Sequence, residues 1–205
     1  TVEVSGVERS WTVVDEDIEH VEDGDGYRVV VAGFRPVSNY TFTVTTTDDE
    51  GGTDSRDVAW TSGALPTDAP TVTVVHAGDD QAPGPLLFGA RRSEPGKTKP
   101  LNDWGVLAAL DADGEYIWYH QTGVPVTAWH RMSDGTVAYF TAGLDRLINV
   151  DLAGAIRNEL TAAELGLDSL HHDFWPTKDG TLVVLSTALH EIDGYPEDAT
   201  HNVVS

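Results

Sequence analysis

Four stretches of sequence that form two similar pairs decide the fold of this chain. Residues 106–120 read VLAALDADGEYIWYH and residues 128–140 read AWHRMSDGTVAYF; residues 146–160 then read RLINVDLAGAIRNEL and residues 171–185 read HHDFWPTKDGTLVVL. Each pair consists of a strand-like segment, a D-x-x-G turn, a second strand-like segment and an Asp-Gly turn before a third. The sequence therefore predicts antiparallel hairpins that repeat in the same order.

The spacing of these turns indicates the type of repeat. Asp111 matches Asp151 at a spacing of 40 residues, and the Asp-Gly turn at 134–135 matches that at 179–180 at a spacing of 45. A period of this length made of short strands is typical of β-propeller blades. Because a propeller closes with about four to eight blades, we expect the first blades of a longer protein, truncated here.

The first 65 residues have a different pattern and predict a separate β-sandwich. Residues 40–44, YTFTV, alternate as a half-buried strand does. Phe34, Pro36 and Tyr40 have a spacing that resembles the tyrosine corner of fibronectin type III and related sandwiches, in which the tyrosine hydroxyl caps the backbone. Further strands are expected at residues 27–31 and 58–61. This unit therefore looks like a fibronectin/Ig-like module.

A Pro- and Ala-rich segment separates the two regions. Residues 62–70, SGALPTDAP, offer little to bury and predict a linker. A strand at residues 72–76 and a loop at 77–85 follow, before the apolar run at 86–88. The chain is thus all-β: a sandwich at 1–65, a linker with a strand leading into the next domain at 66–85, and incomplete propeller blades at 86–205. Only residues 160–170 favour a helix.

Charge and composition limit the functions that this chain can have. Among 205 residues, 34 are acidic and 12 are Lys or Arg, which gives a formal net charge of -22. Such an acidic protein is not expected to bind nucleic acid, because phosphate binding needs clustered cations, and an anionic membrane surface is disfavoured for the same reason. No apolar run approaches the roughly 18 residues that span a bilayer. The acidity is typical of a solubility adaptation.

A metal site is not expected. The chain has no cysteine, so thiolate sites and disulfides are excluded. Nitrogen and oxygen ligands are offered by His171, His172, Asp173, His190 and His201. They have no recognised ligand spacing, and neighbours in a strand cannot easily chelate one ion.

The most unusual chemical cluster is His171-His172-Asp173, immediately before Phe174-Trp175. An imidazole that faces a propeller pocket can transfer a proton near neutral pH, bind an oxyanion or act as a nucleophile. Since adjacent residues of an extended segment point to opposite sides, we expect only one of the two histidines to face the axis. The alternative, a hydrogen-bonded core histidine, stays open.

A second candidate lies in the first repeat, where Trp129, His130 and Arg131 precede the Asp-Gly turn. Either His130 or Arg131 can bind an anionic group of a substrate. An arginine on a strand is more often a solvated structural residue, so both interpretations remain open.

These features together resemble the bacterial arylsulfate sulfotransferases that need no nucleotide sulfate donor. The N-terminal sandwich with its Pro-containing linker, the LDADGEYIWYH segment at 110–120 and above all the HHD segment at 171–173 carry the resemblance. It implies a six-bladed propeller whose pocket transfers a sulfuryl group from a phenolic sulfate ester to a phenol, through a sulfohistidine and without a cofactor.

The resemblance also implies roles for particular residues. His171 or His172 matches the pocket histidine of the second blade, expected to bind the sulfuryl group or transfer protons. The nucleophilic histidine of the family lies in a later blade and has no counterpart here, so this fragment alone is expected to be inactive. An extracytoplasmic protein is implied, periplasmic or secreted, with a lipid anchor upstream of Thr1 as an option. Homo-oligomerisation is left open.

Two other functions remain open at this point. One is a non-catalytic extracytoplasmic propeller that binds a ligand, a glycan or a protein partner, with the sandwich as a spacer. The other is a quinoprotein-like or other propeller enzyme. A pocket histidine in a later blade, with Arg and Asn nearby, would favour sulfuryl transfer.

Overall fold

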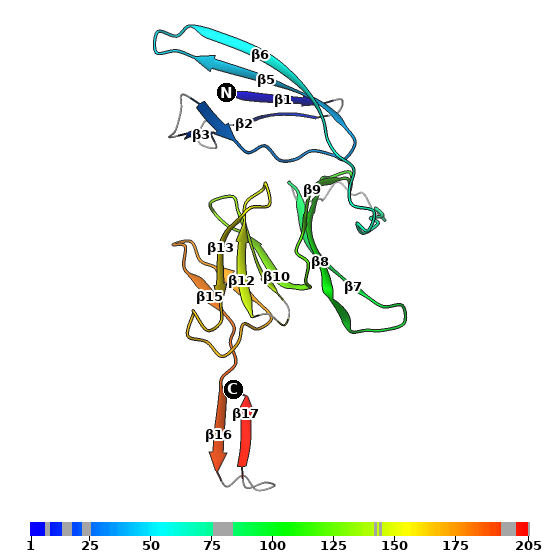
Figure 1. Ribbon diagram of the computed structural model, residues 1–205, viewed down its shortest axis with the longest axis vertical. Coiled ribbons are helices and arrows are strands. Elements are labelled where there is room, and N and C mark those ends of the chain that lie inside the picture. The colour runs from blue at the N-terminus through cyan, green and yellow to red at the C-terminus, as the bar shows by residue number, and fades with distance from the viewer. Residues whose placement is uncertain are drawn as a thin grey trace. The chain divides into compact units, whose positions relative to one another are not determined.

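The computed structural model shows an all-β chain (Figure 1). It describes residues 1–6, 9–13, 18–21, 26–75, 84–141, 143, 145–193 and 200–204. Two compact units can be distinguished, one comprising Thr1–Leu86 with Ala109–Tyr119 and the other Leu87–Ala108 with His120–Ser205. The described residues contain no helix, so the predicted all-β class is confirmed. The domain boundaries expected near residues 65 and 86 stay a prediction.

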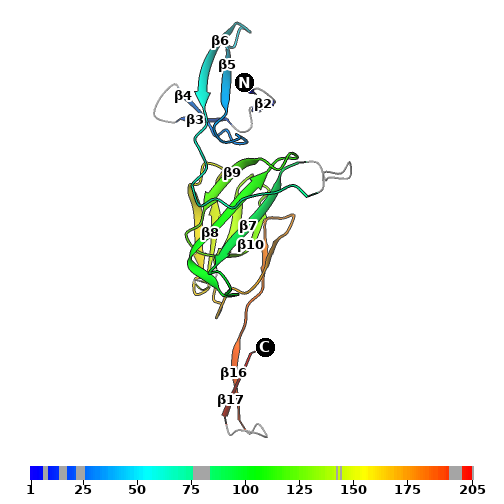
Figure 2. The same cartoon turned by 90° about the vertical axis from the view of Figure 1, so that its right-hand side faces the viewer.

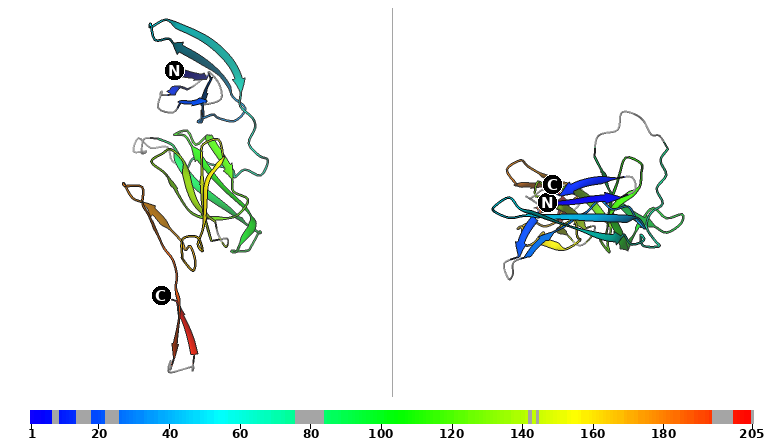
Figure 3. Two further views of the ribbon diagram at one scale, coloured as in Figure 1. Left: turned by 60° about the vertical axis from the view of Figure 1, so that its left-hand side comes forward. Right: turned by 90° about the horizontal axis from the view of Figure 1, so that it is seen from above.

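The first unit contains a four-stranded antiparallel sheet in the order β2-β1-β5-β6 and a separate two-stranded hairpin. The sheet comprises β1 (Val2–Gly6), β2 (Ser10–Val13), β5 (Asn39–Thr47) and β6 (Thr53–Thr61). The hairpin comprises β3 (Ile18–Val21) and β4 (Gly26–Val29). Figure 3 shows β5 and β6 as a long, curved ribbon. The strands expected at 27–31, 40–44 and 58–61 are formed, with boundaries shifted by a few residues.

The core of this unit is built by the alternation that the sequence predicts. Buried Val2, Val4, Val13 and Tyr40 form its centre, with partly buried Val29, Val31, Phe34, Phe42 and Trp11 against them. The hydroxyl of Tyr40 accepts a hydrogen bond from the backbone nitrogen of Arg35 at 2.8 Å. The predicted tyrosine corner is therefore present, and it fixes the loop that leads into β5.

The segment after β6 has no regular structure. Residues 62–75 contain no strand, so the strand predicted at 72–76 is wrong over 72–75; His76 and most of the loop predicted at 77–85 lie outside the described residues. The physical reason is that this segment is fixed by contacts with side chains and not by the backbone hydrogen bonds of a β-sheet. Tyr116 Oη donates to the carbonyl of Pro70 at 2.7 Å, and Val74 contacts Gly114 so closely that an added methyl group there would lie 2.4 Å from Val74 Cγ2.

The three strands β7 (Leu86–Ser93), β8 (Pro100–Leu110) and β9 (Tyr116–Gln121) form a sheet in that order. The D-x-x-G turn at 111–114 connects β8 to β9, as predicted. Trp104 and five consecutive residues of β8, Val106–Leu110, are buried, which fits a strand covered on both faces. A methyl group added at Gly105 would lie 1.9 Å from the carbonyl oxygen of Val124, so only glycine fits where β8 passes this close to the backbone of Val124.

The second unit contains one complete four-stranded antiparallel sheet, β10-β11-β12-β13, in chain order. Its strands are β10 (Val126–Arg131), β11 (Val137–Thr141), β12 (Arg146–Val150) and β13 (Ile156–Thr161). Figure 1 shows this sheet in yellow-green. Four strands in chain order form the antiparallel meander of a propeller blade.

The repeat predicted from the sequence is out of phase with the sheets. The sheet β10-β11-β12-β13 takes its first two strands from the first repeat and its last two from the second. The spacing of turns is the same wherever a unit is taken to start, so sequence periodicity cannot place the sheet boundary. His130 is consequently on the first strand of a sheet, and the HHD segment precedes the first strand of the next.

That next sheet begins with β14 (Phe174–Pro176) and β15 (Leu182–Val184), joined by the predicted Asp-Gly turn. Gly135 and Gly180 of the two Asp-Gly turns have φ angles of 83° and 84°, which residues with a Cβ rarely adopt. Beyond them, β16 (Leu189–Asp193) and β17 (Thr200–Val204) form a further two-stranded sheet.

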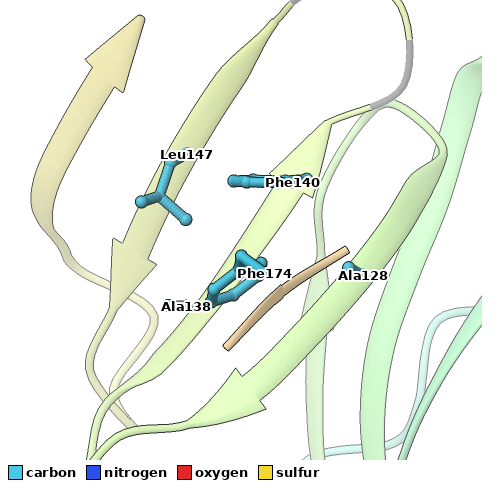
Figure 4. Packing of buried hydrophobic residues seen from close by; sticks show 5 residues of the cluster. All are labelled: Ala128, Ala138, Phe140, Leu147 and Phe174. Atoms are coloured by element: carbon cyan, nitrogen blue, oxygen red, sulfur yellow. The ribbon is translucent and has the colours of Figure 1, made fainter. Parts of the chain in front are cut away.

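A shared core joins the four-stranded sheet to β14. Ala128, Ala138, Phe140 and Leu147 are buried together with Phe174, which is 2% exposed. Figure 4 shows the Phe174 ring over β11, the strand that carries Ala138 and Phe140. The ring centroids of Phe140 and Phe174 are 4.6 Å apart. Fully burying one such side chain stabilises a fold by roughly 1.5–3 kcal/mol.

The stretch that favoured a helix, 160–170, forms a single turn only. Thr161 and Glu164 form a reciprocal capping box, since the nitrogen of Thr161 donates to Glu164 Oε2 and the nitrogen of Glu164 donates to Thr161 Oγ1. Gly166, with φ of 69°, then ends the turn. The helical expectation was wrong because a strong N-terminal cap is followed too soon by a glycine in the left-handed region. No helix of the described residues is long and apolar enough to cross a membrane.

Candidate functional site

Three first strands lie next to one another in the second unit and position the candidate residues. A methyl group added at Gly89 of β7 would lie 2.7 Å from the Trp129 ring of β10, so these two strands are in contact. Figure 2 shows β7 and β10 in the same part of the second unit. β10 in turn lies beside β14. Adjacent first strands are what a propeller places around its axis.

His130 and Asp173 meet across β10 and β14. His130 Nε2 lies 3.4 Å from Asp173 Oδ1, and the side chains are 22% and 62% exposed. Asp173 Oδ1 also accepts a hydrogen bond from the backbone nitrogen of Phe174 at 2.9 Å, which holds the carboxylate at the start of β14. A carboxylate in this position can orient the imidazole through a hydrogen bond.

Two aromatic rings fix the other sides of His130. Its ring centroid is 4.9 Å from that of Phe174 and 5.0 Å from that of Trp175, both with edge-on geometry. Phe174 is anchored in the core, whereas Trp175 is 63% exposed. His130 is therefore held by a buried ring, an exposed ring and a carboxylate.

His171 and His172 lie immediately before β14, and both are exposed. Their ring centroids are 4.0 Å apart with an interplanar angle of 84°. His172 has φ of 56°, and the nitrogen of Asp173 donates to the carbonyl of His171 at 2.7 Å. The nitrogen of His171 donates to the carbonyl of Leu185 at 2.9 Å, so the backbone of the pair is anchored to the residue directly after β15.

The expectation that these two histidines point to opposite sides was wrong. It assumed extended backbone, in which successive side chains alternate. The left-handed conformation at His172 turns the chain sharply, so the two rings lie edge to face. Both imidazoles can therefore act on one ligand.

Arg131 is not brought to this site. It follows His130 on β10, where alternation directs its side chain to the other face, and it is exposed. Within the described part of the chain it forms no ion pair. The role of Arg131 in substrate binding stays a prediction, as do the roles of His130, His171 and His172.

Two residues were missed by sequence reasoning. Trp175 occupies the position that His130 has one repeat earlier, at a spacing of 45 residues, so alignment of the repeats offered a signal for it. His120 at the end of β9 has its ring centroid 6.0 Å from that of Tyr139. Burial lowers the pKa of His120, and the nearby Asp151 partly offsets this. No short motif marks His120 in the sequence.

Ligands for a metal do not converge. Among the residues whose placement is described, no three His, Asp or Glu side chains form a group that could hold an ion. The side chains of His190 and His201, which were named as candidate ligands, lie outside the described residues.

Successive antiparallel sheets with adjacent first strands define an all-β protein whose sheets are consistent with propeller blades. The chain belongs to the arylsulfotransferase (ASST) family, whose model matches residues 71–204. The resemblance found in the sequence is thereby confirmed, and the matched region contains His130, His171, His172 and Asp173. No curated protein matched the chain.

Proposed function

We propose that this protein transfers a sulfuryl group from a phenolic sulfate ester to a phenol through a sulfohistidine intermediate. Its membership in the arylsulfotransferase family supports the reaction class. The observation that carries the proposal is the His171–His172 pair, with ring centroids 4.0 Å apart, next to the carboxylate that contacts His130. Four groups able to bind or move protons thus lie within three consecutive residues and one neighbouring strand.

The proposed reaction proceeds in two displacements. The lone pair of a neutral histidine nitrogen forms a bond to sulfur, while the sulfur–oxygen bond to the phenol breaks and its electron pair leaves on the phenolate oxygen. A protonated imidazole donates a proton to that oxygen. The oxygen of the acceptor phenol, losing its proton to a base, then attacks sulfur, and the nitrogen–sulfur bond returns its electrons to the histidine.

We assign His171 and His172 to sulfuryl binding or proton transfer, not to the nucleophile, which is assigned to no residue of this chain. Two exposed imidazoles in edge-on contact can donate hydrogen bonds to separate oxygens of one sulfuryl group. Asp173 contacts the imidazole of His130, and we assign His130 to the binding of an anionic group of the substrate. Arg131 would bring positive charge to this site only if its side chain turned to the face of β10 that carries His130.

Exposed apolar side chains support the proposal that further blades complete the propeller. Trp175 and Val183, which are paired across the β14–β15 hairpin, and Leu185, directly after β15, are 63%, 57% and 54% exposed. The opposite face, with Phe174, packs on the preceding sheet. A further sheet packed in the same way would cover these three residues. We also propose an extracytoplasmic location, as the family resemblance implies.

The intermediate offers the sharpest test of this function. The protein that contains these residues is mixed with a chromogenic aryl sulfate, without a phenol acceptor and without a nucleotide donor. We expect a burst of phenolate equal to the enzyme concentration, followed by steady turnover only after a phenol is added. Aryl sulfate binding without a burst or turnover would contradict the proposal and favour a non-catalytic binding propeller.

A further inference from the structure

The D-x-x-G turn occurs twice, and in both copies Oδ1 of the aspartate accepts a hydrogen bond from the backbone nitrogen four residues later. Oδ1 of Asp111 accepts from the backbone nitrogens of Asp113 and Glu115, each at 3.0 Å. Oδ1 of Asp151 accepts from the nitrogen of Ala155 at 2.8 Å. In both turns one carboxylate oxygen thus holds the backbone, which leaves Oδ2 for another partner. Since both carboxylates are largely buried, a cation is needed at Oδ2.

The second turn supplies that cation from its own hairpin. Nε and Nη2 of Arg157, on β13, both lie 2.9 Å from Asp151 Oδ2. The residue that corresponds to Arg157 at the 40-residue spacing is Ile117, which is buried and cannot form an ion pair. The first turn therefore has no equivalent arginine within its hairpin.

The first turn takes its cations from the N-terminal region instead. Arg35 Nε lies 2.8 Å and Arg9 Nη1 lies 3.2 Å from Asp111 Oδ2, and Arg35 Nη2 also pairs with Asp113. The side chains of Asp111 and Arg35 are only 9% and 17% exposed. Burial raises the pKa of Asp111, but the bond from Arg35 and backbone donors lower it to a net value below the ordinary one.

The tyrosine corner positions Arg35 for this contact. Its backbone nitrogen donates to Tyr40 Oη at 2.8 Å, and its carbonyl accepts from Ser62 Oγ at 2.5 Å. Both bonds use main-chain atoms, so the guanidinium is left to reach out of the loop. The cost of ordering the arginine is lowered because its backbone is already fixed.

Contacts from the linker adjoin the same hairpin and do not involve charge. Tyr116 Oη donates to the carbonyl of Pro70 at 2.7 Å, and Val74 packs against Gly114. The hairpin between β8 and β9 is therefore contacted from the N-terminal side by two arginines, a proline carbonyl and a valine.

We propose that the first D-x-x-G turn is the docking point of the N-terminal sandwich, and that Arg35 is the residue that docks it. The partner of this surface is part of the same chain. Ile117 replaces the in-hairpin arginine of the second repeat, which leaves Asp111 Oδ2 for Arg35. This assignment is independent of the proposed sulfuryl transfer.

Distance measurements between spin labels test the docking. The chain has no native cysteine, so labels can be attached through Asp49→Cys and Glu115→Cys, which are both exposed positions. We expect one narrow distance distribution in the otherwise unchanged protein. Arg35→Gln should at least double its width, because the ion pairs of Arg35 with Asp111 and Asp113 are lost while the main-chain bonds of residue 35 are retained.

A matched pair of variants separates docking from turn stability. Asp111→Asn keeps an oxygen for the turn but removes the negative charge, so it should broaden the distribution as Arg35→Gln does, and the double variant should broaden it no further. Arg157→Gln, which removes the corresponding ion pair of the second turn, should leave the width unchanged. A distribution that is already broad in the unchanged protein, or one that stays narrow in Arg35→Gln, would overturn the proposal.

Discussion

Tyr40 Oη lies 2.8 Å from the backbone nitrogen of Arg35, five residues earlier in the chain. The ring of Tyr40 is buried in the core, while Arg35 extends its side chain to Asp111. One hydrogen bond thus links the interior of the first unit to an ion pair with the hairpin at 111–115. The predictions below begin from this corner.

Removal of the Tyr40 hydroxyl should destabilise the first unit measurably. In Tyr40→Phe the partly buried nitrogen of Arg35 loses its acceptor, and we expect the free energy of unfolding to fall by about 1–2 kcal/mol. Denaturant unfolding measures the change. The same substitution at Tyr27, whose side chain is 70% exposed, should cost less than about 0.5 kcal/mol. Equal losses at both positions would contradict the role of the corner.

Val37 should respond in the opposite direction. It follows Pro36 in the corner with φ of 51° and is 70% exposed, and a β-branched residue is strained in this region. Val37→Gly should raise the free energy of unfolding by about 0.5–1 kcal/mol after the entropy of glycine is subtracted. Val58→Gly, within β6, should lower it. A lower free energy of unfolding in Val37→Gly would show that the backbone of Val37 is not strained.

The core beneath the candidate site can be tested at two adjacent residues. Phe174→Ala removes a ring that is 2% exposed and packs on Phe140, and we expect a loss of about 3–5 kcal/mol in the free energy of unfolding. Trp175→Ala removes a larger but 63% exposed ring, so its loss should be below about 1 kcal/mol. A larger effect from Trp175 would mean that the two faces of β14 have been assigned the wrong way round.

Acid sensitivity is expected from His120. Burial lowers its pKa below the ordinary value of 6.5, so the unfolded chain takes up a proton at a higher pH than the folded chain does. The titration of His120 therefore leaves the free energy of unfolding unchanged above pH 6.5 and lowers it as the pH falls below that value. Thermal melting between pH 5 and pH 8 should therefore show a smaller acid-side loss in His120→Gln than in the unchanged protein. Parallel profiles would contradict this.

The sequence predicted those features that depend on local patterns. The Asp-Gly turns, the alternation in β5 and the tyrosine corner each need only residues close together in the chain. The sheet boundaries could not be predicted, since a period is the same from any starting point. The left-handed conformation of His172 also could not, because histidine carries no signal for it as strong as that of glycine.

Contacts between residues far apart in the chain could not be predicted from the sequence, for a different reason. Arg35 and Asp111 are 76 residues apart, and neither has a neighbour that marks the pairing. Among the candidate residues, the sequence indicated His130 and the HHD segment separately. Their meeting through Asp173 depends on β10 and β14 lying side by side, which is a property of the assembled sheets.

Sulfuryl transfer at the His171–His172 pair is tested most directly by an assay of the protein that contains these residues, with an aryl sulfate as donor, a phenol as acceptor and no nucleotide. Replacing both histidines with alanine should lower the turnover at least tenfold, because the groups that bind the sulfuryl oxygens and move protons are removed. Since both side chains are exposed, the variant should retain its fold, which the melting temperature checks. Unchanged turnover in a folded double variant would contradict the assignment.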